Sequence, residues 1–208
     1  MSFETILSEL NHHQKLAAMH GDSHALVLAG AGCGKTKTII ARAAYLISQG
    51  TPAERIQILT FTRKSASEIV ERVRLALGES SHGLRASSFH TWCISMIRSA
   101  PRVFGLSNFT VIDRDDQLQL FKVLRGKQEK GQLPTAAEIC DLYSYARNTR
   151  KPLSSALEKK APDFLEKKEK IAQIMRAYQI KKKEYKYFDY DDILDMIARG
   201  MAQHPELK

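Results

Sequence analysis

The stretch from Ala25 to Thr36, ALVLAGAGCGKT, limits the possible folds of this chain more than any other. Its first five residues form an apolar run between a histidine and a glycine cluster, which predicts a buried strand over Ala25 to Ala29. Behind the cluster, apolar residues recur with helical spacing until Gly50. A strand, a glycine-rich turn and a helix in this order are the setting of a phosphate-binding loop.

Each residue type in this loop suits the binding of a nucleoside triphosphate. Gly30, Gly32 and Gly34 permit positive φ angles and close approach of the backbone, so that successive N–H groups can face phosphate oxygens. Lys35 is expected to reach the β and γ phosphates, and the Thr36 hydroxyl to bind Mg²⁺. The first position of the usual pattern, GxxxxGK[ST], is alanine here. A plain turn that joins a strand to a helix is the alternative.

The net charge of +9 is concentrated in one block of the chain. Residues 114 to 186 carry 18 Lys and Arg side chains against 10 Asp and Glu, so nearly the whole excess lies there. Such a block favours a polyanionic partner, with nucleic acid as the first candidate. A solvated basic face is the alternative.

Composition also indicates the compartment. No apolar run approaches 18 residues and the N-terminus lacks a basic region, so we predict neither a membrane span nor a secretory signal. Cys33, Cys93 and Cys140 lie far apart, which is typical of reduced thiols rather than of disulfides or a zinc site. We therefore expect a cytoplasmic protein with no membrane partner.

Two further strand and helix pairs follow the loop. Ile56 to Phe61 reads as a buried strand, and the helical pattern after it ends at Gly78. Leu84 to His90 reads as a shorter strand or an extended segment, followed by a helix from Thr91 to Ser99. Three strands alternating with three helices predict an α/β fold with a parallel sheet covered on both faces.

The segment Phe109 to Asp113, FTVID, has two interpretations. An apolar strand that ends in Asp resembles a Walker B segment, in which Asp113 would hold Mg²⁺ through water. The same Asp113 directly precedes an amphipathic helix, and a role as its N-cap, with Asp116 at the third helical position, is the simpler explanation.

Strands disappear after Asp113. Helical patterns cover residues 114–125, 135–148 and 164–185, and the amphipathic pattern resumes over 187–201. The first three of these helices coincide with the basic block, so the chain carries an all-α insertion over that block.

Five segments together resemble one family. They are LNxxQ at 10–14, AGAGCGKT at 29–36, LTFTRKSASEI at 59–69, SSFHTWC at 87–93 and FDYDDIL at 188–194. In this order and spacing they resemble the superfamily 1 helicases of the UvrD/Rep/PcrA type, over nearly the whole chain. The resemblance implies a RecA-like P-loop NTPase domain formed by 1–113 and 187–208, with 114–186 as an inserted all-α subdomain. It also implies ATP hydrolysis coupled to movement along single-stranded DNA, usually 3′ to 5′, and unwinding at duplex junctions.

The resemblance assigns further nucleotide contacts. Gln14 matches the family's adenine-reading glutamine, and Lys37 stands where many members have an arginine near the nucleotide. From the residues alone, Gln14 reads as the capping-box partner of Asn11 at the start of a helix, and one amide cannot serve both roles fully. The implied cofactors are ATP and Mg²⁺. The implied site comprises Gln14, Ala29, Gly30, Ala31, Gly32, Cys33, Gly34, Lys35, Thr36 and Lys37, with Lys35 and Thr36 catalytic and Thr36 on the metal.

The resemblance also assigns single-strand contacts to Phe61, Thr62, Arg63, Phe89 and His90. An aromatic ring can stack on any base, which suits a translocase without sequence preference. The family commonly has Asn at the position of Arg63, which here could contact a phosphate or block a base pocket. Burial in the core is the alternative for both phenylalanines.

The last matched segment, at the return to the first domain, contains Asp189, Tyr190 and Asp192. Helix capping and core packing explain these residues equally well.

The family's DExQD segment, which holds Mg²⁺ and activates the attacking water, is absent from the sequence. We therefore expect an N-terminal fragment of a helicase, incomplete at its C-terminus, without ATP turnover of its own, whose remaining helicase domains lie in the full-length chain. One alternative is a standalone nucleic-acid-binding module with a structural P-loop. Another is a compact P-loop NTPase that uses Asp113.

Overall fold

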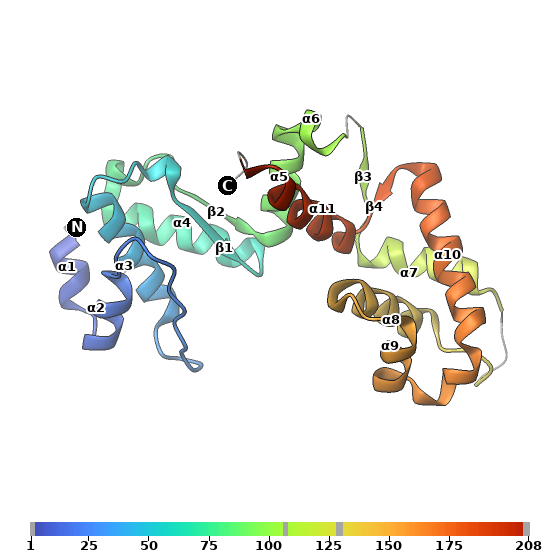
Figure 1. The fold of residues 1–208 in the computed structure, drawn as a ribbon. Coiled ribbons are helices and arrows are strands. Elements are labelled where there is room, and N and C mark those ends of the chain that lie inside the picture. Colours follow the sequence, from blue (N-terminus) through green and yellow to red (C-terminus); the bar gives the residue numbers. More distant parts are fainter. Residues whose placement is uncertain (1–2, 106–107, 128–130, 206–208) are drawn as a thin grey trace. The chain divides into compact units, whose positions relative to one another are not determined.

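A computed structural model describes residues 3–105, 108–127 and 131–205 (Figure 1). The chain forms two compact units, which divide between Trp92 and Cys93 and are called unit 1 and unit 2 below. The two units are defined by how the chain packs. The predicted boundaries of the inserted subdomain, at 113/114 and 186/187, divide the chain at other positions and stay a prediction.

Unit 1 combines helices with one small sheet. Its elements are α1 (Phe3–Ser8), α2 (His12–Ala18), α3 (Lys35–Ser48), a 3₁₀ turn (Ala53–Arg55), β1 (Gln57–Thr60), α4 (Arg63–Leu77), a 3₁₀ turn (Gly78–Ser81), β2 (Arg85–Ser88) and the start of α5 (Phe89–Ser99). Strands β1 and β2 are parallel, with Gln57 opposite Arg85 and Thr60 opposite Ser88. The predicted second and third strands are therefore confirmed, although β2 ends at Ser88 and Phe89 already begins a helix.

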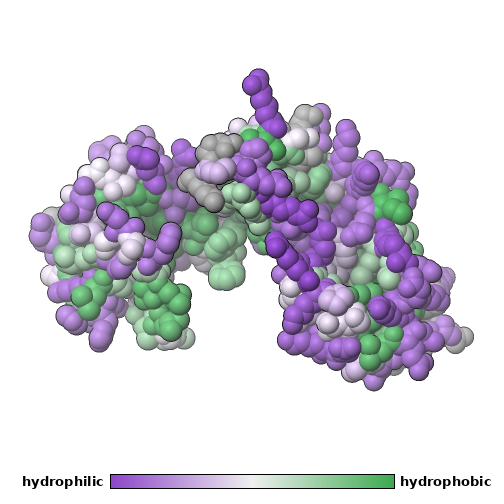
Figure 2. Space-filling model, in the orientation of Figure 1, coloured by the Kyte–Doolittle hydropathy of each residue, from purple (hydrophilic) through white to green (hydrophobic). Residues whose placement is uncertain are grey.

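The first predicted strand is wrong. Ala25 to Ala29 has no regular structure, and Leu26 and Leu28 are 85% and 87% exposed. A strand needs a neighbour that pairs with its backbone, and within the described residues of unit 1 the sheet consists of β1 and β2 alone. The apolar composition of a segment indicates that it tends to be buried. It does not indicate whether an adjacent strand is present to pair with it. Figure 2 shows hydrophobic surface at the lower end of unit 1, where this loop lies.

The core of unit 1 lies between its helices and the sheet. Helix α4 packs against β1 and β2, and α3 packs against α4. The buried side chains in this layer include Ile40, Ile58, Ile69 and Val73. A second, smaller cluster joins α1 to α3 through Ile6 and Ala44. The core thus holds the start of α3 and the ends of both strands, which carry the predicted binding residues.

Unit 2 is almost entirely helical. Its elements are the rest of α5, α6 (Pro101–Phe104), β3 (Thr110–Val111), α7 (Arg114–Arg125), α8 (Ala136–Thr149), α9 (Leu153–Lys160), a 3₁₀ turn (Pro162–Lys167), α10 (Lys168–Tyr185), β4 (Tyr187–Phe188) and α11 (Tyr190–Gln203). Three of the predicted helices agree with α7, α8 and α10 within a few residues. Helix α9 was not predicted, because its eight residues are too few to establish a helical period.

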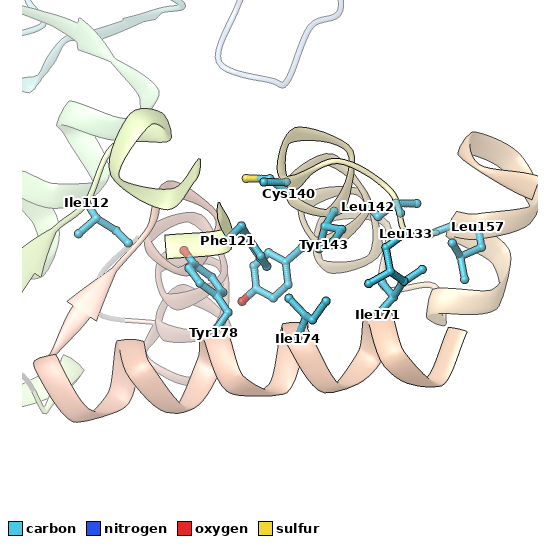
Figure 3. Close-up of a cluster of buried hydrophobic side chains, with 13 residues drawn as sticks. Ile112, Phe121, Leu133, Cys140, Leu142, Tyr143, Leu157, Ile171, Ile174 and Tyr178 are labelled. Carbon is cyan, nitrogen blue, oxygen red and sulfur yellow. The ribbon is translucent and has the colours of Figure 1, made fainter. Parts of the chain in front are cut away.

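An aromatic stack lies at the centre of this unit (Figure 3). The rings of Phe121 and Tyr178 are stacked with centroids 4.3 Å apart, and Tyr143 meets Tyr178 edge-on at 5.1 Å. Helices α7, α8 and α10 each supply one of these rings, so the stack joins the three helices. The cluster continues through Ile139 and Leu157 to α9.

Asp113 is the N-cap of α7. Its carboxylate accepts hydrogen bonds from the N–H groups of Asp115 and Asp116, and the Asp116 side chain accepts from the Asp113 N–H. The capping interpretation is confirmed.

Strands β3 and β4 pair in parallel, with Thr110 opposite Tyr187 and Val111 opposite Phe188. The chain therefore leaves for α7 and returns from α10 through neighbouring strands, which places the two ends of the predicted insertion side by side.

A buried ionic network connects α10 to the start of α11. The Lys182 ammonium lies 2.5 Å from Asp189 Oδ2 and also contacts Asp192. Tyr178 donates to Asp189 Oδ2 at 2.8 Å, and Arg147 pairs with Asp192 at 2.9 Å. Asp189 and Asp192 also form a capping box, which confirms the capping and packing interpretation of this segment.

The network shifts the ionisation of its members. Burial alone would raise the pKa of Asp189, but the charge of Lys182 and the hydrogen bonds from Lys182, the Asp192 N–H and Tyr178 hold it below its ordinary value. Burial opposes the charge of Lys182, while the attraction of Asp189 and Asp192 raises its pKa. The pair is therefore ionised in the folded state, and removal of one partner would leave the other charge buried.

Candidate nucleotide and nucleic-acid sites

The glycine loop of unit 1 turns into α3 through left-handed backbone. Gly32 and Gly34 have φ angles of 74° and 75°, a region that other residues rarely adopt. A Cβ atom on Gly34 would also lie 2.7 Å from Gln14 Nε2, so a larger residue there would displace the Gln14 amide from its place beside the loop. Of the three glycines that permit positive φ, Gly32 and Gly34 adopt it and Gly30 does not.

The start of α3 offers donors to an anion. Gly34 is the N-cap and supplies no side-chain hydrogen bond, so the first N–H groups of the helix have no capping acceptor. The Lys35 ammonium is exposed and donates to Gly30 O at 2.6 Å and to Ala29 O at 3.4 Å, directly over the loop. Within the described residues the half-buried Thr36 hydroxyl makes no hydrogen bond. The predicted phosphate and metal ligands thus lie together at one helix end.

Gln14 uses both ends of its side-chain amide. Its Oε1 accepts from the Asn11 N–H at 3.0 Å, and Asn11 Oδ1 accepts from the Gln14 N–H at 2.9 Å, which completes the predicted capping box. Its Nε2 donates to Cys33 O at 3.0 Å. The capping role is therefore confirmed, and the same side chain also ties α2 to the glycine loop.

A cavity of about 760 Å³ lies beside this loop. Gln14 on α2, the chain between His20 and Gly30, and Lys35 on α3 contribute to its walls. Its size is within the range of sites that hold cofactors. The predicted base contact, Gln14, and the predicted phosphate contact, Lys35, therefore face one common space.

Two residues of the predicted nucleotide site, Lys37 in α3 and Cys33 in the glycine loop, differ from the rest. Lys37 pairs with Glu9, 2.9 Å from Oε2, and donates to the Glu9 carbonyl at 3.0 Å, so it ties α3 to the connection between α1 and α2. Cys33 is exposed, with Sγ 3.8 Å from Ala31 O. Lys37 would have to leave Glu9 to contact a nucleotide.

The two predicted aromatic contacts lie together at the edge of the sheet. Phe61 follows β1 and Phe89 follows β2, and the carboxyl ends of parallel strands meet at the same edge. Their ring centroids are 6.2 Å apart at an interplanar angle of 54°. Phe61 is 95% exposed and Phe89 is 44% exposed. The alternative interpretation, that both phenylalanines are buried in the core, is therefore wrong.

The remaining predicted DNA contacts flank these rings. Thr62 is the N-cap of α4, because its hydroxyl accepts from the Ser65 N–H at 3.1 Å, a role that the sequence reasoning missed. Arg63, the first residue of α4, is exposed. His90 is half-buried in the first turn of α5. A cation and two open rings thus share one edge of unit 1.

Arg42 is a residue of the cavity that the sequence reasoning missed. Its side chain reaches from α3 to the backbone after α2 and lines the same cavity as Gln14. Its spacing of seven residues from Lys35, about two helical turns, places both on one face of α3 and was the available signal.

Comparisons with known proteins show the family to which the chain is similar. Residues 10–208 match the family model described as UvrD/REP helicase N-terminal domain. The chain is 30% identical over 210 residues to the ATP-dependent DNA helicase UvrD1 of Mycobacterium tuberculosis, covering 98% of this chain and 27% of the relative. It is 32% identical over 215 residues to the probable DNA helicase II homolog of Mycoplasma capricolum, covering 100% and 29%. It is 29% identical over 205 residues to the ATP-dependent DNA helicase PcrA of Staphylococcus aureus, covering 97% and 28%.

The chain spans less than a third of the length of these relatives. Among the helices that the structure describes, none combines the length and the apolar character needed to cross a bilayer.

Proposed function

The chain belongs to the UvrD/REP helicase family, and from this premise we propose that it is the ATP- and single-stranded-DNA-binding N-terminal part of an ATP-dependent DNA helicase. In this proposal the whole protein is an enzyme that moves 3′ to 5′ on DNA. Residues 1–113 and 187–208 belong to its RecA-like domain, and 114–186 form the inserted basic subdomain. Its relatives are named as ATP-dependent DNA helicases.

The phosphate loop carries the proposal. The left-handed glycines, the uncapped start of α3 and the Lys35 ammonium provide donors and positive charge at one point. Lys35 would exchange its bonds to Gly30 O and Ala29 O for phosphate oxygens. Thr36 would give one hydroxyl ligand to Mg²⁺, with phosphate oxygens and water at the other positions. Bound Mg²⁺ would neutralise charge on the triphosphate.

Adenine recognition by Gln14 requires an exchange of partners. Both ends of the amide are occupied, by the Asn11 N–H and by Cys33 O. Adenine presents both a donor and an acceptor to such an amide. Gln14 would therefore give up one or both contacts when it reads the base, so base recognition would release a constraint on the glycine loop.

Single-stranded DNA is assigned to the edge with Phe61 and Phe89. Exposed rings at strand ends can stack on bases of any sequence, and Arg63 lies next to them to meet a phosphate. The basic helices of residues 114–186 supply positive charge for a further DNA contact, such as a duplex junction.

The fragment itself is proposed to bind without turnover, because the carboxylates that activate water in the family have no counterpart in this sequence. A compact NTPase that uses Asp113 is disfavoured, since that carboxylate already caps α7 with two hydrogen bonds. A standalone nucleic-acid-binding module with a structural P-loop differs in one measurable respect, because its DNA affinity would not depend on a working nucleotide site.

Isothermal titration with Mg·ATP tests the proposal. Lys35→Ala is expected to raise the Kd for ATP about 100-fold, because it removes charge-assisted hydrogen bonds to phosphate. Arg72→Ala is the matched control, since Arg72 pairs with Glu68 on the exposed side of α4. Equal ATP affinity in the wild type and Lys35→Ala, or no ATP binding by the wild type, would contradict the nucleotide assignment.

A fluorescent oligonucleotide of mixed sequence tests the second site. The double variant Phe61→Ala, Phe89→Ala is expected to weaken DNA binding at least about tenfold, because stacking contributes about 1–3 kcal/mol per base. Its ATP affinity should stay unchanged. Leu75→Ala is the control, since Leu75 is an exposed apolar residue of α4. If Leu75→Ala lost DNA affinity to the same extent, the assignment of DNA binding to the sheet edge with Phe61 and Phe89 would be contradicted.

A further inference from the structure

The guanidinium of Arg42 fastens the backbone that follows α2. Its Nη1 donates to Ala18 O at 3.2 Å and to His20 O, and its Nη2 donates to Gly21 O at 3.1 Å. Ala18 is the last residue of α2, and the final carbonyls of a helix have no partners within it. His20 and Gly21 lie in the turn after the helix, and Arg42 supplies donors to their carbonyls as well. One side chain from α3 therefore holds the whole turn after α2.

Arginine suits this position better than any other residue. The guanidinium carries five N–H donors in a fixed plane, so one group can reach several carbonyls at once. Its positive charge is also favourable beside the C-terminal end of a helix. Arg42 is half-buried and lies 5.6 Å from the centroid of the Tyr45 ring, which limits its movement. A lysine would offer a single ammonium in place of this planar group.

Helix α2 is thus attached at both of its ends. Near its start, Gln14 Nε2 donates to Cys33 O in the glycine loop. At its end, Arg42 holds Ala18 to Gly21 against α3. The first attachment depends on the residue that would read the base, so it would be exchanged when a nucleotide binds. The second uses only backbone carbonyls and would be kept.

We propose that Arg42 is a positioning residue for the adenosine part of the nucleotide. It keeps α2 and the wall between His20 and His24 in place against α3, from which Lys35 and Thr36 reach the phosphates. This inference rests on the proposed function, because it assumes that the cavity beside the loop holds ATP. Arg42 itself does not contact the nucleotide in this proposal. Its role is to fix the spacing between the wall of the cavity that faces the base and the wall that faces the phosphates.

Two ligands separate positioning from a general structural role. ATP needs both sides of the cavity, whereas inorganic tripolyphosphate needs only the loop and the start of α3. We expect Arg42→Ala to raise the Kd for Mg·ATP about tenfold and to leave the Kd for Mg·tripolyphosphate within about twofold. The Kd of Arg42→Lys for Mg·ATP should lie between those of the wild type and Arg42→Ala, whereas its Kd for Mg·tripolyphosphate should stay near that of the wild type. Titration calorimetry on the 208-residue chain measures both ligands.

Hydrogen exchange on the nucleotide-free protein provides a second measurement. Amides of residues 19–24 should exchange faster in Arg42→Ala, while those of α4 should not change. Arg72→Ala is the control, because it removes an arginine of unit 1 that pairs with Glu68 on the surface of α4.

The outcomes separate the inference from the function on which it rests. Unchanged ATP affinity in Arg42→Ala, or an equal loss for ATP and tripolyphosphate, overturns the positioning role while the nucleotide site stands. An Arg42→Lys variant as weak as Arg42→Ala for both ligands has the same meaning. A wild-type chain that binds tripolyphosphate and ATP equally tightly also overturns it, since the base side then contributes nothing. A wild type that binds neither ligand overturns the proposed function itself.

Discussion

Among the described residues, unit 1 leaves more large apolar side chains in solvent than unit 2 does. Leu26 and Leu28 beside the glycine loop are almost fully exposed, as is Phe61 at the sheet edge. In unit 2, by contrast, Phe121 and Tyr178 have no exposed surface. Both units come from one chain of ordinary composition, so the difference lies in what each arrangement buries.

The charged groups follow the same division. In unit 1 the Lys35 ammonium is exposed and held only by carbonyls, so it can turn to a phosphate. In unit 2 Lys182 is buried between two carboxylates and is committed to them. Side chains that can exchange hydrogen-bond partners are suited to binding a ligand. Side chains with fixed, buried partners are suited to stabilising the fold. We therefore expect the glycine loop of unit 1 to serve ligand binding and the buried network of unit 2 to serve stability.

The largest contrast should appear in cysteine reactivity. Burial raises the pKa of the Cys140 thiol in unit 2 to about 12, so the folded protein keeps its proton and at pH 8 about one thiol in 10⁴ is ionised. Cys33 in the glycine loop is exposed. Iodoacetamide at pH 8 should label Cys33 at least about a thousandfold faster than Cys140, measured by peptide mass spectrometry.

Labelling in urea is the control for this experiment, because all three cysteines should then react at similar rates. Comparable labelling of Cys33 and Cys140 in the folded protein would break the comparison, since it would mean that unit 2 opens as readily as the loop.

The second contrast concerns the buried lysine. Lys182→Met is expected to destabilise unit 2 by about 3–5 kcal/mol, because it leaves the charge of Asp189 buried without its cation, while Asp192 keeps its pair with Arg147. Urea unfolding followed by the near-ultraviolet circular dichroism of the buried tyrosines measures this. Lys183→Met, at the exposed neighbour, should change stability by less than about 0.5 kcal/mol.

A further substitution sharpens the result. Adding Asp189→Asn to Lys182→Met removes one stranded charge and should restore part of the lost stability. If Lys182→Met were as stable as the wild type, the ionic network would not be what stabilises unit 2.

The smallest effect is expected in the exposed apolar loop. Leu28→Ser should change the free energy of unfolding by less than about 0.5 kcal/mol, because the side chain is already in solvent. Leu157→Ser, at a fully buried position of unit 2, should cost more than about 2 kcal/mol. Urea midpoints of the two variants measure the difference. A large loss in Leu28→Ser would mean that the loop is packed in solution.

Local rules predicted much of the molecule from its sequence. The caps at Asn11, Asp113 and Asp189 follow from an acceptor side chain three residues before a suitable partner, which needs no knowledge of the fold. The helix after the glycine loop and the strands that end near Phe61 and Ser88 follow equally from periodicity and turn residues.

Features that depend on distant partners were not predictable in this way. The apolar character of Leu26 and Leu28 cannot reveal whether a neighbouring strand is present. Whether Phe61 is buried depends on what covers the sheet edge. The carbonyls that Arg42 binds lie on a turn more than 20 residues earlier, and no local pattern relates the two.

The pairing of β3 with β4 has a consequence for how such chains change over time. Adjacent strands lie about 4.8 Å apart, so the points where residues 114–186 leave and rejoin the chain are close neighbours. A segment whose ends meet in this way can be lengthened, shortened or exchanged for another as one piece, and a few residues can bridge the gap that its removal leaves. Evolution could thus alter the basic helices as one piece while the glycine loop of unit 1 keeps its form.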